Sequence, residues 1–221
     1  ENIQQGKFEL IESLPSDGIG ILNGDDEKQL SYKIKNDCKI LWIGIDNKKV
    51  DCYAKDIELT YKGTKFTAVF KDGNEYEFET KLLGRNNIYN ILAGITLGKE
   101  LGISITNLQK AVKRVAPIEH RLSMTKYYDI NIIDDAYNSN PMGCKMALEV
   151  LNMMPGKHIV VTPGMIEVGA KEDEVNKEFG RQIADNTDEV ILIGEEKTKP
   201  IYEGLIEKQF PKDKIHILND V

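Results

Sequence analysis

The regular alternation of apolar runs and amphipathic segments in the second half of the chain most constrains its fold. The apolar runs and the helical segments between them are 130–134, 142–154, 157–164, 172–186, 189–194, 199–210 and 214–218. Strand-helix-strand units of this kind predict right-handed crossovers and a largely parallel sheet. Ligands of such sheets bind beyond the carboxyl ends of the strands, where "DDAYNSNP" (134–141) and "TPGMIEVG" (162–169) lie.

The first half of the chain has a different pattern. "IGILNGDD" (19–26) and "CKILWIGI" (38–45) indicate buried strands, the first with an asparagine and two aspartates at its carboxyl end. Residues 50–83 are rich in β-branched and aromatic side chains and contain the hairpin signal "KDGN". This part is predicted to be antiparallel.

Two helices are predicted to follow. The first, within 86–102, has apolar residues at three- and four-residue spacing, which are Ile88, Ile91, Leu92, Ile95 and Leu101. The second covers 104–115, with Ser104 or Thr106 as N-cap. Pro117 and the loss of periodicity predict a domain boundary near 115–119.

Composition excludes several classes of function. A chain of 221 residues is long enough for one large or two ordinary domains. Its net charge of -7 argues against nucleic acid as the main partner, because such binding needs clustered Lys and Arg. No apolar run reaches the roughly 18 residues that span a bilayer, and the first ten residues do not resemble a signal peptide. We therefore expect a soluble, cytoplasmic protein.

The cysteines do not indicate a framework or a metal site. Cys38, Cys52 and Cys144 are odd in number, far apart and in no CxxC arrangement. This usage fits a reducing cytoplasm. The chain begins without Met and stops just after a predicted strand, so we expect both ends to be cuts through a longer protein.

Three polar clusters are candidates for ligand binding, and each also has an ordinary explanation. Asn87 and Asn90 lie on one face at the start of a helix, where they either face an anion or cap the helix. His120 and Arg121 either hold a base and a phosphate or form a solvated linker. Asp135 either accepts ribose hydroxyls or binds a metal, or its loop is simply a turn.

Compact catalytic signatures are missing from this sequence. The adjacent Asp134 and Asp135 point to opposite sides of a strand, so they do not form one catalytic pair, and one of them is expected to be buried or capping. The chain contains no GxGxxG, GxxxxGK[ST], GxSxG or HExxH motif. Separately, the three clusters are weak signals.

Their order along the chain is more specific. "GRNNIYNILAG", "EHRLS", "IIDDAYNSNP", "ALEVL" and "VVTPGMIEVG" follow one another, with "EFGRQIA" and "VILIG" behind them. This succession resembles the Mur ligases, the ATP-dependent amide-forming enzymes of peptidoglycan synthesis, over nearly the whole chain. The loop "DDAYNSNP" looks most like the branch that joins D-alanyl-D-alanine to UDP-N-acetylmuramoyl-tripeptide.

The resemblance implies an α/β protein of two parts. Residues 1–115 resemble the latter half of the family's central, P-loop-type ATPase domain, and 116–221 resemble most of its C-terminal, Rossmann-like domain. The P-loop, the UDP-sugar domain, the carbamylated lysine and the ligands of Mg²⁺ are then expected upstream, and no metal ligand is assigned to these 221 residues. Alone, this piece is expected to be inactive, and the whole enzyme is expected to be monomeric.

The same resemblance implies roles for individual residues. Asn87 matches an adenine contact and Asn90 a phosphate contact; His120 is expected near adenine, Arg121 at the γ-phosphate and Asp135 on the ribose. Three residues of the loop are expected to face the incoming amino component, and they are Tyr137, Asn138 and Asn140. One position departs from the family: Asn86 stands where histidine is common, and an amide there keeps a hydrogen bond but takes no proton.

The implied chemistry is acyl activation by ATP and Mg²⁺, with Arg121 offsetting charge on the transferred phosphoryl group. Another muramyl ligase or a folylpolyglutamate synthase-like enzyme stays open as an alternative. So does a non-catalytic nucleotide-binding module. A related amidotransferase subunit is disfavoured, because its zinc-ribbon cysteines have no counterpart here.

Overall fold

The computed structural model describes residues 2–137, 140–166 and 168–219 of the chain. The chain divides into two compact units, Glu1–Ala116 and Pro117–Val221. Assigning these ranges to two domains of a longer ligase stays a prediction. No helix in the described ranges is both long and apolar enough to cross a membrane.

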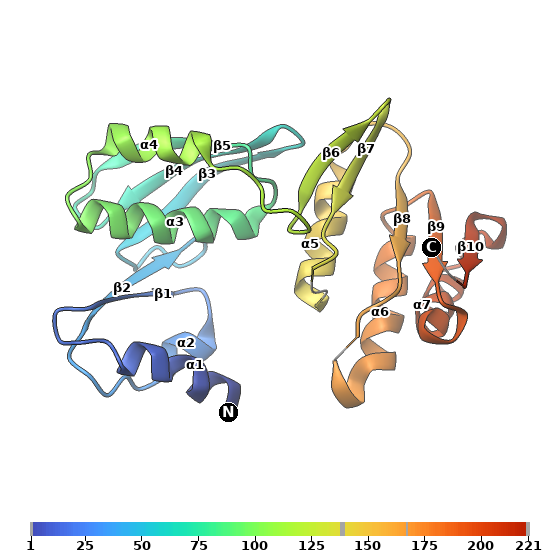
Figure 1. The fold of residues 1–221 in the computed structure, drawn as a ribbon, viewed down its shortest axis with the longest axis horizontal. Helices are drawn as coiled ribbons and strands as arrows, with labels where there is room; N and C mark the ends of the chain where they lie inside the picture. Colours follow the sequence, from blue (N-terminus) through green and yellow to red (C-terminus); the bar gives the residue numbers. More distant parts are fainter. Residues whose placement is uncertain (1, 138–139, 167, 220–221) are drawn as a thin grey trace. The chain divides into compact units, whose positions relative to one another are not determined.

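The first unit is built on one mixed sheet (Figure 1). Its strands, in spatial order, are β1 (Ile19–Asn23), β2 (Lys39–Gly44), β3 (Cys52–Thr60), β4 (Gly63–Phe70) and β5 (Glu75–Thr80). The pairs β1–β2 and β2–β3 are parallel, whereas β3–β4 and β4–β5 are antiparallel. This confirms the change of pattern predicted at residue 50, and the "KDGN" stretch is the turn between β4 and β5.

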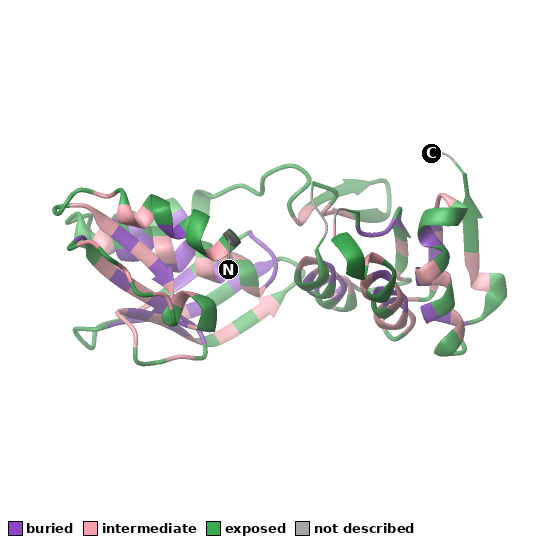
Figure 2. Ribbon diagram, turned by 90° about the horizontal axis from the view of Figure 1, so that it is seen from below, coloured by how far each residue is buried: buried purple, intermediate pink, exposed green. Residues whose placement is uncertain are grey.

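Two helices, α3 (Arg85–Glu100) and α4 (Ile105–Arg114), pack against this sheet and bury its core. Figure 2 shows the buried residues gathered between the helices and the strands. The predicted apolar stripe of α3 is confirmed at Ile88, Ile91, Leu92 and Ile95, each of them buried. Leu101 was wrongly included, since it is the C-cap residue, beyond the last full turn, and is exposed.

Two further helices of the first unit precede β2 along the chain. The helix α1 (Asn2–Glu12) was not predicted, because its apolar residues form no continuous stripe at three- and four-residue spacing, and α2 (Glu27–Leu30) is a single turn capped by Asp26. The rings of Phe8 and Tyr32 stack at 3.8 Å between centroids, which ties α1 to the segment after α2.

Within its described residues the second unit has two sheets and three α-helices, which can be followed in Figure 1. A hairpin of β6 (Ser123–Tyr127) and β7 (Ile130–Asp134) comes first. A parallel sheet of β8 (Ile159–Thr162), β9 (Glu189–Ile193) and β10 (Ile215–Leu218) follows, in the order β10-β9-β8. The helices are α5 (Pro141–Asn152), α6 (Glu172–Ala184) and α7 (Glu195–Glu207), and short 3-10 turns precede α6 (Gly169–Lys171) and β10 (Lys212–Lys214).

The largely parallel sheet is confirmed for β8, β9 and β10, but one strand differs from the prediction. Residues 130–134 were expected to belong to that sheet, and β7 instead pairs antiparallel with β6. The strand β6 was missed because its residues are almost all exposed, so no apolar run marks it. A two-residue turn at Tyr128 and Asp129 joins the two strands, with φ of 53° at Tyr128 and no glycine to signal it.

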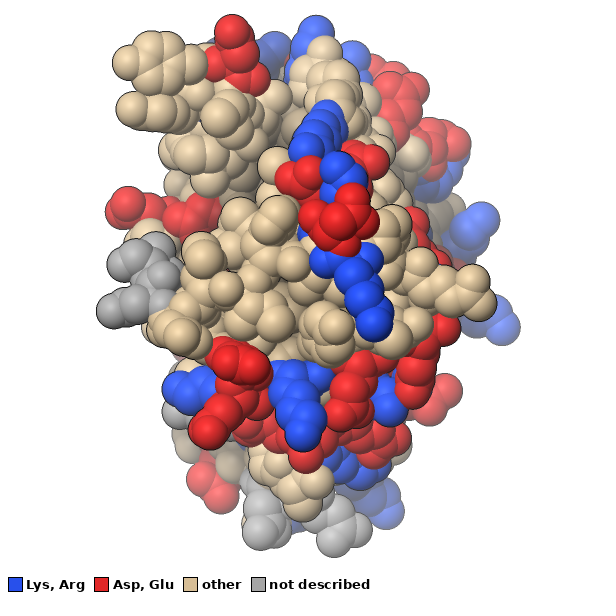
Figure 3. All heavy atoms as spheres, turned by 90° about the vertical axis from the view of Figure 1, so that its right-hand side faces the viewer, with Lys and Arg blue, Asp and Glu red and all other residues tan. Residues whose placement is uncertain are grey.

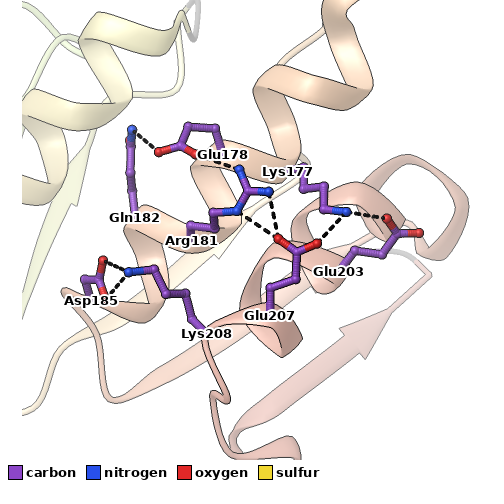
Figure 4. Close-up of polar contacts among 8 residues, drawn as sticks. All are labelled: Lys177, Glu178, Arg181, Gln182, Asp185, Glu203, Glu207 and Lys208. Atoms are coloured by element: carbon purple, nitrogen blue, oxygen red, sulfur yellow. Dashed lines mark hydrogen bonds and ion pairs between the residues drawn. The ribbon is translucent and has the colours of Figure 1, made fainter.

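The helices α6 and α7 approach each other closely because glycines lie at their contact. A Cβ atom on Gly180 would overlap the carbonyl oxygen of Ile201, and one on Gly204 would overlap that of Lys177. Ion pairs cross the exposed side of the same contact, and Figure 4 shows Arg181 and Lys177 both meeting Glu207. On the face drawn in Figure 3, acidic and basic side chains likewise lie intermixed.

Candidate functional site

The hairpin register brings two polar segments of the second unit together. Ser123 pairs with Asp134, so residues 120–122 lie opposite residues 135–137 just beyond the hairpin's open end. The backbone N–H of Tyr137 donates to the carbonyl of His120 at 3.2 Å. We call His120, Arg121, Leu122, Asp134, Asp135 and Tyr137 the paired-loop site.

Side-chain contacts join the two segments of the paired-loop site, residues 120–122 and residues 134–137. Asp135 Oδ1 accepts the backbone N–H of Leu122 at 3.0 Å. The Nδ1 atom of His120 lies 2.7 Å from Asp134 Oδ2, and the guanidinium of Arg121 lies 4.0 Å from the ring centroid of Tyr137. A cation over an aromatic face is held by the ring quadrupole, so Tyr137 orients Arg121, whose guanidinium has no hydrogen bond among the described residues.

The backbone around Arg121 is strained. His120 has φ of 61° and Leu122 has φ of 49°, a region that residues with a side chain seldom adopt. Strain of this kind costs on the order of 1–3 kcal/mol per residue and persists only where surrounding contacts impose it. Here the hydrogen bonds to Asp134 and Asp135 impose it, and the result is an exposed Arg121 between two fixed neighbours.

Asp135 is the carboxylate with unused capacity in this site. It is half-buried, and among the described residues only the Leu122 N–H donates to it, through Oδ1. Burial raises the pKa of Asp135, and the Leu122 hydrogen bond and the charge of Arg121 offset this only in part. A carboxylate in such a place gains from additional hydroxyl donors or a cation.

Asp134 is the residue that sequence reasoning left without a defined role. It was treated as the neighbour on the opposite side of the strand, and the structure gives it two partners, His120 and the Ala136 N–H at 3.1 Å. The two carboxylates have different hydrogen-bond partners, and their separate roles stay a prediction. The signal was the register of an unpredicted hairpin, which the sequence pattern did not reveal.

The loop residues after Asp135 have different surroundings. Tyr137 is exposed apart from its contact with Arg121. Asn140 is the N-cap of α5, and its Oδ1 accepts the Gly143 N–H at 3.0 Å, with Pro141 at the first helical position. Asn138 lies outside the described residues. The turn-and-cap explanation of this stretch is therefore confirmed at Asn140, and a substrate contact there stays a prediction.

Asn87 and Asn90 lie in the first unit, in the first turns of α3. The side-chain amide of Asn87 donates to the carbonyl of Leu83 at 2.8 Å, and Asn90 donates to Asn87 Oδ1 at 3.3 Å. Neither caps the helix, because the N-cap residue is Gly84 and no side chain bonds there. Capping does not explain this pair, and the exposed Asn86 beside it has no side-chain partner among the residues described.

The sequence pattern did not reveal the structural role of Asp25, a carboxylate of the first unit. Asp25, just after β1, accepts the N–H groups of Ile45 at 2.6 Å, Asp46 at 3.1 Å and Asn47 at 2.6 Å. The hydroxyl of Tyr89 on α3 also donates to it, at 2.7 Å. Asp25 therefore ties the ends of β1, β2 and α3 together.

Within the described ranges, no group of three or more His, Cys, Asp or Glu side chains is arranged to hold a metal ion. No step through Mg²⁺ is therefore assigned to them. The parts of a nucleotide fit better, since the paired-loop site offers an imidazole, an exposed arginine and a carboxylate with an open oxygen among the described residues.

Two known family models match the chain. The Mur ligase middle domain matches residues 1–98, and the Mur ligase, glutamate ligase domain matches residues 120–221. Together the two models account for most of the chain, which belongs to the Mur ligase family.

Two similar curated relatives carry the same enzyme name. UDP-N-acetylmuramoyl-tripeptide--D-alanyl-D-alanine ligase of Bacillus subtilis is 32% identical over 219 residues, 97% of this chain and 46% of that protein. The ligase of the same name from Escherichia coli is 27% identical over 197 residues, 88% of this chain and 43% of the other. The chain thus spans about half the length of the curated relatives it matches.

Solved structures agree on the fold. MurF from Acinetobacter baumannii matches with a TM-score of 0.81 at 21% identity, covering 97% of this chain and 45% of that one. MurF ligase from Thermotoga maritima in complex with ADP matches with a TM-score of 0.79 at 20% identity, covering 97% and 47%. At these identities the likeness establishes the α/β fold of both units.

Proposed function

We propose that this chain is part of an ATP-dependent, ADP-forming ligase that adds D-alanyl-D-alanine to UDP-N-acetylmuramoyl-tripeptide in peptidoglycan synthesis. Family membership and the names of its most similar curated relatives support the reaction. The observation that carries the proposal is the paired-loop site, in which His120, Arg121 and Asp135, three side chains of different chemistry, are each held by a residue of the facing segment.

Each of these groups suits one part of ATP. Asp135 has a carboxylate oxygen open to ribose hydroxyls, and the Arg121 fork of donors suits phosphate oxygens. The half-exposed ring of His120 suits the base. In the first unit, Asn87 is assigned to adenine and Asn90 to phosphate, while Tyr137, Asn138 and Asn140 are assigned to the incoming dipeptide.

The proposed chemistry has two steps. A terminal carboxylate oxygen of the tripeptide attacks the γ-phosphorus of ATP, and ADP leaves. The dipeptide amine then attacks the acyl phosphate carbon, loses a proton, and the tetrahedral intermediate expels phosphate. ATP supplies the phosphoryl group, and Mg²⁺, whose ligands are predicted elsewhere in the longer protein, is expected to accompany it.

The described residues contribute to this reaction by positioning and charge. Arg121 is fixed by Tyr137 and by two strained neighbours, so its guanidinium needs little reorganisation to meet developing negative charge. Asp135 is held by Leu122, which keeps the ribose end of the nucleotide in register with Arg121. These two residues are therefore proposed to set where the γ-phosphate lies.

A second ligase has some support in the comparisons. UDP-N-acetylmuramate--L-alanine ligase of Dictyoglomus turgidum is 29% identical over 165 residues, 73% of this chain and 35% of that protein. The "DDAYNSNP" loop and the longer matches favour the dipeptide-adding reaction.

The test is phosphate release by the protein extended to its natural ends, with ATP, Mg²⁺ and UDP-N-acetylmuramoyl-tripeptide. Release should depend on D-alanyl-D-alanine, and Asp135→Asn should reduce it while Asp129→Asn, at the exposed turn between β6 and β7, should not. Dependence on L-alanine with UDP-N-acetylmuramate instead would move the assignment to the second ligase. If the protein bound nucleotide but released no phosphate in response to any acceptor, it would be assigned as a non-catalytic nucleotide-binding module.

A further inference from the structure

The contact between His120 and Asp134 defines the state of the imidazole. The Nδ1 atom lies 2.7 Å from Asp134 Oδ2, and the side chain of His120 is 52% exposed against 29% for Asp134. The Nδ1 side of the ring is therefore occupied, and Nε2 has no hydrogen bond among the described residues.

Both partners are held from the backbone, so this contact is not a chance meeting of two surface side chains. Asp134 ends β7 and its Oδ1 accepts the Ala136 N–H at 3.1 Å. The carbonyl of His120 accepts the Tyr137 N–H at 3.2 Å, and the backbone of His120 has φ of 61°. The ring direction is consequently set by the hairpin and its loops.

The chemistry of the pair fixes the tautomer. An ionised carboxylate only accepts hydrogen bonds, so the hydrogen lies on Nδ1 of His120, and in the neutral ring Nε2 is then an acceptor. His158 is in the opposite situation, since its Nε2 lies 2.8 Å from the carbonyl oxygen of Met154. A carbonyl also only accepts, so His158 carries its hydrogen on Nε2.

We propose that Asp134 is a positioning and specificity-determining residue, which holds His120 with Nε2 as an acceptor and so selects a purine with an amine at position 6. The exocyclic amine of adenine donates to such a nitrogen, whereas the oxygen of a 6-oxo purine would face it lone pair to lone pair. This inference rests on the proposed function, because it takes the base of ATP as the group beside His120.

The tautomer can be measured without turnover. Full-length protein labelled with ¹⁵N-histidine is studied by two- and three-bond ¹H–¹⁵N correlation at about pH 8.5, above the usual range for histidine. His120→Gln and His158→Gln assign the signals. His120 should show the Nδ1–H pattern and His158 the Nε2–H pattern, and Asp134→Asn should change only the first. An Nε2–H pattern for His120 in the unaltered protein would overturn the inference.

Specificity is measured as the ratio of kcat/KM for ATP to that for inosine triphosphate, which has oxygen at position 6. Asp134→Asn should lower this ratio about tenfold, the size expected for one lost hydrogen-bond discrimination. Asp134→Glu should restore part of it, and the control Asp129→Asn should keep the full ratio.

Two outcomes separate this inference from the proposed function. If Asp134→Asn lowers activity with both nucleotides by the same factor, Asp134 only braces the loop and the inference fails. If the unaltered full-length protein has no ATP-dependent activity while His120 shows the Nδ1–H pattern, the proposed function fails, and the selection of a purine fails with it.

Discussion

Two aspartates of similar exposure, Asp25 and Asp135, each follow the carboxyl end of a strand and differ in what surrounds them. Asp25 accepts three backbone N–H groups and a tyrosine hydroxyl. Asp135 accepts one N–H among the described residues. A carboxylate that accepts hydrogen bonds from several groups of its own chain has a structural role. One that keeps an oxygen without a hydrogen bond is suited to bind a ligand.

The pKa values of the two groups shift in opposite directions for this reason. Burial by itself raises the pKa of Asp25, but the hydrogen bonds from Ile45, Asn47 and Tyr89 outweigh it and leave the pKa lowered. Burial also raises the pKa of Asp135, and there the hydrogen bond from Leu122 does not compensate. Position after a strand therefore does not reveal a carboxylate's role, whereas the count of its donors does.

Asp25→Ala should have the largest effect on stability. It leaves the N–H groups of Ile45 and Asn47 without their acceptor, and each such loss near the core costs on the order of 1–3 kcal/mol. We expect the free energy of unfolding of the first unit to fall by about 2–4 kcal/mol in urea melts. A loss below about 0.5 kcal/mol would contradict the structural role of Asp25.

Arg121→Lys should have the next effect, on activity. Lysine keeps the charge but loses the planar fork and the fixed stacking on Tyr137, so kcat/KM for ATP should fall about tenfold or more. Stability should change by less than about 1 kcal/mol, because the stacking is exposed. The control Lys126→Arg on β6 should leave kcat/KM unchanged. Equal rates for Arg121→Lys and the unaltered enzyme would remove Arg121 from the phosphate site.

Lowering the pH should change the contributions of Asp25 and Asp135 to folding stability in opposite directions. The lowered pKa of Asp25 means that its ionised form stabilises the fold above the reference value of 3.8, and this is lost as pH falls through the folded pKa. The raised pKa of Asp135 means that its charge costs stability at neutral pH, and the cost disappears as pH falls below 3.8.

Melts of each Asp→Asn variant beside the unaltered protein, from about pH 7 to about pH 3, measure these terms. The stability deficit of Asp25→Asn should shrink on acidification. Asp135→Asn should be as stable as the unaltered protein or slightly more so at neutral pH, by about 1 kcal/mol at most after allowance for solvent screening. If both variants differed from the unaltered protein in stability with the same sign at neutral pH, the contrast between Asp25 and Asp135 would be contradicted.

Asn90→Ala should have the smallest effect on the fold. Its hydrogen bond to Asn87 is exposed and 3.3 Å long, so the free energy of unfolding should change by less than about 0.5 kcal/mol. ATP affinity should nevertheless weaken if Asn90 contacts phosphate. A stable variant with unchanged affinity, measured by calorimetry, would remove Asn90 from the proposed phosphate contacts.

Sequence patterns predicted most of the regular structure. The helices α3 to α7 and the strands β8 to β10 have strong periodicity, and all of them are present. The elements that were missed bury little: in the described part of α1 only Phe8 is buried, and β6 is almost wholly exposed. Periodicity reports burial, so an exposed strand leaves no trace in it.

The candidate site was predictable residue by residue but not as a geometry. His120, Arg121, Asp135 and Tyr137 were identified from motifs, and the structure brings them together. Their contacts depend on which residue of β6 lies opposite Asp134, which is a matter of hairpin register. The pairing of His120 with Asp134, and the capping by Asn140, follow from that register and from the start of α5.

The most direct test of the central claim is the ATP affinity of Asp135→Asn in the full-length protein, measured by calorimetry beside its thermal midpoint, with Asp129→Asn as the control. We predict an ATP affinity at least about tenfold weaker, from the loss of a charged acceptor, and a midpoint within about 2 °C of the unaltered protein. An unchanged affinity in a folded variant would contradict the claim that Asp135 and the paired-loop site hold the nucleotide.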